Sequence, residues 1–111
     1  MLIEQTVLEY LQRELDMDEV YPEIPNPIPE KFVVLHVIDR NKSDQINEVT
    51  IEFMSYAPSK YEAAVLDDQV RTAMEEIVQI DDISCHFGGG NDNPDTTLKI
   101  PRYRCYFNLF Y

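Results

Sequence analysis

Two hydrophobic periods alternate along this chain, and their order constrains its fold more than any other feature. Apolar residues recur every three to four positions in residues 2–15 and 59–77, which predicts two amphipathic helices. They alternate, or form short continuous runs, in residues 32–38, 48–53, 83–87 and 103–111, which predicts strands. Short polar turns between neighbouring strands favour antiparallel pairing. We therefore expect an α+β fold in the order α-(β)-β-β-α-β-β, with a mainly antiparallel four- to five-stranded sheet and two helices packed on one face.

The length and net charge of the chain limit the classes of protein to which it can belong. The 111 residues match a single domain, 1–111, and a hydrophobic content of 44% allows a core without disulfide or metal support. With 9 basic against 21 acidic residues, the net charge of −12 excludes ordinary binding to nucleic-acid phosphates and disfavours docking on an anionic membrane. No apolar run is long enough to span a bilayer, and the first residues lack the pattern of a signal peptide. We expect a chain that is not secreted and remains in the cytoplasm.

Four prolines between Pro22 and Pro29 predict an extended, non-helical path for residues 22–30. We interpret this segment as a stiff strap across the surface. Its apolar side chains, Tyr21, Ile24 and Ile28, either cover the edge of the core or form an arm that reaches over a neighbouring subunit.

The middle of the chain carries a strand pair and a helix start. Residues 32–38 (FVVLHVI) are apolar at both parities, as in a strand buried on both faces or inside an assembly. Polar residues 39–47 predict the turn at a hairpin tip. Ser59 and Glu62 form a capping box, so the second helix should begin at Ser59. The expected buried stripe of that helix is Tyr61, Ala64, Val65, Val70, Ala73, Met74 and Ile77.

Residues 88–94 (GGGNDNP) are the strongest break in the sequence and predict a long flexible loop. The oxygen-bearing side chains around it suggest a calcium loop, but the EF-hand pattern fails because its sixth position is Thr96 and its twelfth is Arg102. The glycines lack the following Lys-Ser/Thr of a phosphate-binding loop. We expect no bound metal and no cofactor, and a weak cation site in this segment is the alternative.

Side chains with catalytic potential are present, but none has a catalytic pattern. His36 and His86 have no zinc-type spacing, and Cys85 and Cys105 are best interpreted as small buried hydrophobic residues. Paired carboxylates are typical of a solvated face in a chain this acidic. These pairs are Asp67-Asp68, Glu75-Glu76 and Asp81-Asp82. We expect that the protein is not an enzyme.

The last predicted strand is unusually aromatic. Its alternation places Tyr103, Cys105, Phe107, Leu109 and Tyr111 on one face. Tyr106 and Phe110 lie on the other face. Two interpretations remain open: a central strand with helices on one face, or an aromatic face that meets another subunit, where Tyr and Phe are enriched.

Taken together, these features resemble the small tail terminator (tail completion) proteins of long-tailed phages and prophages. The resemblance covers nearly the whole chain: an N-terminal helix, the segment Tyr21–Pro29, the strand starting FVVL, a second strand ending near Ser55–Ala57, and the helix with Tyr61 and Ala64. The Gly/Asn/Asp segment and Arg102-Tyr103 complete it. The chain departs from the pattern between Arg40 and Asn47, where a tight turn with glycine is expected and no glycine occurs.

The resemblance implies a structural virion protein that forms a ring, a hexamer, on the end of the tail tube. The ring would end polymerisation of the tube protein and present the head-joining surface, so its partners are further copies, the tail tube protein and a neck or head-completion protein. It would act in the host cytoplasm and then reside in the virion tail. The candidate interface residues are Tyr21, Ile24, Ile28, Gly88, Gly89, Gly90, Asn91, Asp92, Asn93, Asp95, Tyr106 and Phe110. The alternatives are another head–tail connector component or a small non-enzymatic adaptor domain.

Overall fold

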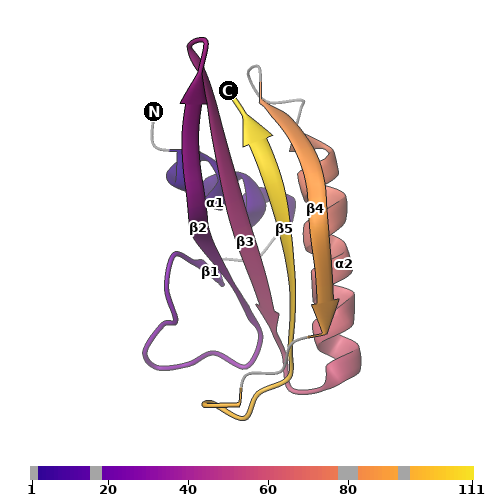
Figure 1. The fold of residues 1–111 in the computed structure, drawn as a ribbon. Helices are drawn as coiled ribbons and strands as arrows, with labels where there is room; N and C mark the ends of the chain where they lie inside the picture. Colours follow the sequence, from indigo (N-terminus) through magenta and orange to yellow (C-terminus); the bar gives the residue numbers. More distant parts are fainter. Residues whose placement is uncertain (1–2, 16–18, 78–82, 93–95) are drawn as a thin grey trace.

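The computed structural model describes residues 3–15, 19–77, 83–92 and 96–111 (Figure 1). The elements are α1 (Ile3–Glu14), β1 (Val20–Tyr21), β2 (Phe32–Ser43), β3 (Ile46–Tyr56), α2 (Lys60–Glu75), β4 (Ser84–Asp92) and β5 (Arg102–Phe110). The strands form one sheet in the order β1-β2-β3-β5-β4, and both helices lie behind it in Figure 1. Among the described strands, β1 and β2 pair in parallel, and the other neighbouring pairs are antiparallel. The predicted α+β fold is confirmed, with a mixed sheet.

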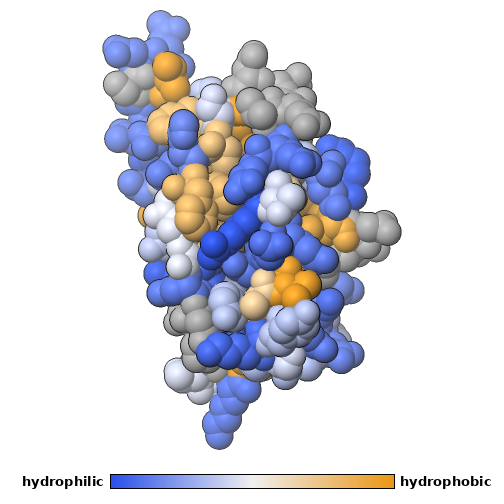
Figure 2. Space-filling model, turned by 90° about the vertical axis from the view of Figure 1, so that its right-hand side faces the viewer, coloured by the Kyte–Doolittle hydropathy of each residue, from blue (hydrophilic) through white to orange (hydrophobic). Residues whose placement is uncertain are grey.

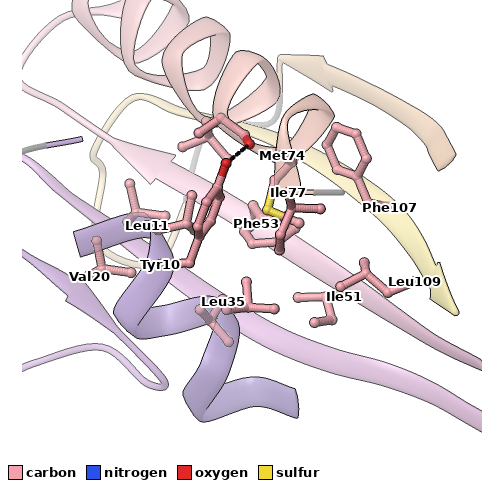
Figure 3. Packing of buried hydrophobic residues seen from close by; sticks show 14 of the residues in the cluster. Tyr10, Leu11, Val20, Leu35, Ile51, Phe53, Met74, Ile77, Phe107 and Leu109 are labelled. Atoms are coloured by element: carbon pink, nitrogen blue, oxygen red, sulfur yellow. Dashed lines mark hydrogen bonds between the residues drawn. The ribbon is translucent and has the colours of Figure 1, made fainter. Parts of the chain in front are cut away.

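The core lies between the helices and the sheet. Helix α1 contributes a stripe at helical spacing, with Ile3, Val7 and Leu11 fully buried. In Figure 3, side chains of α1, α2 and the sheet converge on one hydrophobic cluster. Phe53 and Phe107 meet edge to face, with ring centroids 6.1 Å apart. The alternation predicted for the last strand is confirmed, because Cys105, Phe107 and Leu109 of β5 are buried and the residues between them are not.

Helix α2 begins as predicted, but its buried face is shifted. The hydroxyl of Ser59 accepts a hydrogen bond from the Glu62 backbone N–H at 3.1 Å, as an N-cap residue does. Tyr61 is 78% exposed and Val65 is also exposed, so the expected stripe is wrong at these two positions. The buried residues are Ala63, Leu66, Asp67, Val70, Ala73 and Met74. Burial follows the phase of the whole stripe, and an apolar residue outside that phase stays at the surface.

The β2–β3 hairpin is longer than the sequence indicates. Pairing continues to Ser43 and Ile46, so the turn consists of Asp44 and Gln45 rather than residues 39–47. Both turn residues have positive φ, 50° and 66°, the backbone that a two-residue hairpin turn needs. The expected burial of residues 32–38 on both faces holds only for Phe32–Leu35, because His36 and Ile38 are exposed.

Strand β4 corrects the prediction for the glycine-rich segment. Residues Gly88–Asp92 form a strand, not a loop, because β5 supplies pairing partners as far as Asp92, which lies opposite Tyr103. A bulge between Phe87 and Gly89 accommodates one extra residue. The last two predicted loop positions, Asn93 and Pro94, lie outside the described residues, as does the candidate interface residue Asp95.

Candidate interaction surface

The face of the sheet opposite the helices is the candidate interaction surface, and it differs along its length. At the end nearest the start of β2, this face is covered by a second hydrophobic cluster. The rings of Phe32 and Tyr56 stack there at 4.4 Å with an interplanar angle of 6°. Tyr21, Leu98 and Ile100 from neighbouring segments pack on the cluster. This end of the face is therefore closed by the chain itself.

The middle of the face is polar. Arg104 Nη1 lies 3.1 Å from Glu52 Oε2, and the Arg104 guanidinium lies over the ring of Tyr106, 5.5 Å from its centroid. Thr50 donates a hydrogen bond to Asn108 across the strands at 2.7 Å. Tyr106, one of the predicted interface residues, thus lies half-buried among cross-strand polar pairs.

At the hairpin end, the same face becomes apolar again. Phe110, another predicted interface residue, meets His86 edge to face at 5.6 Å. With Asp44, Ile46 and Glu48 it lines a shallow hollow of about 230 Å³, and Ile46 is exposed. Figure 2 looks onto the β4 side and shows hydrophobic residues gathered at the upper left, between hydrophilic surroundings. This part of the face can accept a partner with an apolar contact.

The glycines of β4 provide room for Tyr106. A Cβ atom on Gly88 or Gly89 would lie 3.2 Å and 3.4 Å from the Tyr106 ring, and Gly89 has a φ of 136°. Gly88–Gly90, with Asn91, form the backbone of an edge strand rather than a mobile contact loop. The structure therefore places these candidates at the sheet edge, beside Tyr106.

The sequence left two roles open for the apolar residues of the proline-rich segment: covering the edge of the core, or reaching over a neighbouring subunit. The structure divides these residues between the two. Tyr21 belongs to β1 and packs on the second cluster, so it covers the core. Ile24 and Ile28 are exposed, although large and apolar. These two side chains remain available to a partner.

A buried ion pair beneath β4 was missed by the sequence interpretation. Asp67, expected on a solvated face, is 4% exposed, and its Oδ2 lies 2.8 Å from Arg71 Nε. The Arg71 guanidinium also stacks on Phe87 at 4.8 Å. Burial raises the pKa of Asp67, opposed by the positive charge of Arg71. The i,i+4 spacing of Asp67 and Arg71 was the available signal.

The two cysteines behave as hydrophobic residues. Cys105 is buried and Cys85 half-buried, and both are free thiols. Burial raises the pKa of Cys85 to about 12 and that of Cys105 further still. A raised pKa disfavours the thiolate, which is the nucleophilic and metal-binding form.

Both edges of the sheet offer unpaired backbone. β1 covers the outer edge of β2 only beside Val33 and Val34, so the edge from Leu35 to Ser43 has no strand partner among the described residues. Among the residues that the structure describes, no backbone hydrogen bond reaches the outer edge of β4. Unpaired edge N–H and C=O groups are a template for pairing with another chain.

The described residues contain no group of three or more side chains able to hold a metal ion, and their helices are too short or too polar to span a membrane. No protein-family model matches the chain, and no curated protein is significantly similar to it.

Proposed function

We propose that this protein is a structural assembly component that caps the tail tube of a long-tailed phage as a ring. In this role it ends polymerisation of the tube protein and presents the surface to which the head is joined. The observation that carries the proposal is a sheet with a partly uncovered face and two edges, the β2 edge beyond Val34 and the β4 edge, that lack strand partners among the described residues. A ring needs heterologous contacts, in which two different surfaces of one subunit meet.

The shape of the molecule supports the same proposal. Its principal extents are 43 × 25 × 23 Å, and the β2–β3 hairpin extends beyond β4 and β5 (Figure 1). The exposed Ile46 and the half-buried Phe110 lie at that end. We propose that this end contacts the tube or the neck, since apolar residues in a polar rim are typical of interface cores.

The test is to add purified protein to growing tail tubes of the matching phage and image the tube ends by negative-stain microscopy. The expected result is density on one end only, together with arrested growth. Ile46→Asp should weaken capping by about tenfold or more, as loss of an interface anchor does. Tyr61→Asp, on the exposed side of α2, is the matched control and should cap normally. Bare, freely growing tubes would refute the terminator role and favour a neck component or an adaptor.

A further inference from the structure

The two unpaired edges of the sheet match each other in polarity. Because β2, β3, β5 and β4 lie side by side with alternating direction, β4 runs antiparallel to β2. If two copies stand side by side in the same orientation, β4 of one copy therefore meets β2 of the next as an antiparallel pair. Such a contact is heterologous and repeats around a ring.

The two edges also match in the number of residues between equivalent rows of the sheet. Each edge strand carries one bulge, and the two bulges lie at nearly the same position along the strands. The rows of paired residues connect Asp39 with His86 and His36 with Gly89 through the inner strands. Between these two rows β3 has one intervening residue, Ile51, whereas β2 and β4 each have two. The edges therefore fit each other in one continuous register, from Leu35 opposite Gly90 to Asn41 opposite Ser84.

This register brings the exposed hydrophobic residues of the two edges together. Ile38 is 48% exposed on β2 and Phe87 is 49% exposed on β4. Counted inward from either row, this register brings the two residues opposite each other, although the row through Ile51 and Phe107 connects Phe87 with Val37. Cross-strand pairs of an aromatic and a β-branched side chain stabilise sheets. A groove of about 360 Å³ opens along the same edge of β2, and it is lined by Glu4, Pro22, Leu35, His36, Val37 and Arg40.

Charge favours the same contact. Although the chain carries −12, residues 84–90 (SCHFGGG) contain no Asp, Glu, Lys or Arg. Residues 35–41 (LHVIDRN) contain one acidic and one basic residue, so both segments are neutral overall. Gly88–Gly90 carry no side chains that would hold a second backbone away. The two edges can approach without bringing carboxylates together.

We propose that β4 of one copy pairs with the free edge of β2 of the next copy, over Ser84–Gly90 and Leu35–Asn41, and that Phe87 and Ile38 form its apolar centre. This inference rests on the proposed ring and names its subunit contact. The occupant of each edge is a second copy of this chain.

Cysteine cross-linking in trans tests the contact. His86→Cys and Asp39→Cys, each combined with Cys85→Ala, place exposed thiols on opposite members of one predicted pair. A mixture of the two variants should form a disulfide-linked dimer under mild oxidation, and neither variant should do so alone. Tyr61→Cys mixed with Asp39→Cys is the control and should remain unlinked. Self-linking of His86→Cys would show a symmetric β4–β4 contact and overturn the proposal, as would an unlinked mixture at the highest soluble concentration.

A second variant tests the apolar centre without relying on disulfide geometry. Phe87→Ser should weaken self-association by about tenfold or more in sedimentation, as hot-spot residues do. Val65→Ser, an exposed residue of α2, is the matched control and should associate normally. Unchanged association of folded Phe87→Ser would contradict the proposal. The two proposals fail separately: a linked mixture that leaves tubes uncapped refutes the terminator role alone, whereas capped tubes with an unlinked mixture refute the edge contact alone.

Discussion

Asp67 shows how the phase of a helix decides the environment of a single residue. Asp67 and Asp68 are neighbours in the sequence, but only Asp68 is exposed. Asp67 falls on the buried face with Leu66 and Val70, where Arg71 supplies the opposite charge. Burying a carboxylate is costly unless it is paired, so Arg71 makes this position tolerable.

The raised pKa of Asp67 predicts a specific dependence of stability on pH. Its ordinary pKa is 3.8, and burial raises the pKa in the folded state above that value. The associated stability is therefore fully present below pH 3.8 and is lost as the pH rises through the raised pKa. Urea unfolding at several pH values should show that the free energy of wild type minus that of Asp67→Asn decreases as the pH rises. The same substitution at exposed Asp68 is the control. A difference that grows with pH would contradict this account.

The close surroundings of Gly90 predict that adding a methyl group at this position lowers the stability of the fold. A Cβ atom there would lie 2.8 Å from the Arg104 carbonyl oxygen and would also overlap the Arg71 guanidinium. Gly90→Ala should lower the free energy of unfolding by about 1–3 kcal/mol, the usual cost of overpacking. Gly88→Ala, whose nearest atoms would be 3.2 Å away, should lose less. Equal losses for the two variants in urea unfolding would refute the steric explanation.

At the scale of elements, a buried hydrogen bond adds to the packing of α1 against α2. The Tyr10 hydroxyl donates to the Ala73 carbonyl oxygen at 2.6 Å, drawn as a dashed line in Figure 3. Tyr10→Phe should lower the free energy of unfolding by about 1 kcal/mol, the typical net value of such a bond. Tyr61→Phe changes an exposed ring and should leave stability unaltered. An unchanged free energy of unfolding for Tyr10→Phe would show that packing alone holds the two helices together.

Elements with a regular hydrophobic period were predictable from sequence, and elements formed by pairing were not. The helices and β5 follow their apolar spacing, and the cap at Ser59 marks the start of α2. The glycine half of β4 has no such spacing, because pairing with β5 and not its own residue types fixes its conformation. The hairpin was too short in the prediction because residues 39–47 have no apolar period, and pairing between the two strands extends them into this polar segment. The sequence did not indicate which strands lie at the edges or that Phe87 is exposed on one of them, since edge position depends on strand order.

At the scale of the whole molecule, charge opposes assembly and should make it sensitive to salt. In the proposed ring, subunits that each carry −12 would repel one another. Added salt shortens the range of this repulsion to about 10 Å or less, while apolar contacts at the edges persist. We therefore expect higher ionic strength or divalent cations to favour the oligomer in sedimentation velocity experiments. An identical oligomer at low and high ionic strength would argue against this electrostatic balance.

The second hydrophobic cluster has a consequence for motion. Near the start of β2 the sheet is covered on both faces, whereas towards the hairpin it is covered on one face only. Local opening is easiest where fewest apolar contacts must be broken. Amide hydrogen exchange should therefore be graded along each long strand, slow beside Phe32 and Tyr56 and fast near Ile46. The hairpin end can adjust its shape to a partner while the opposite end keeps the strands in register.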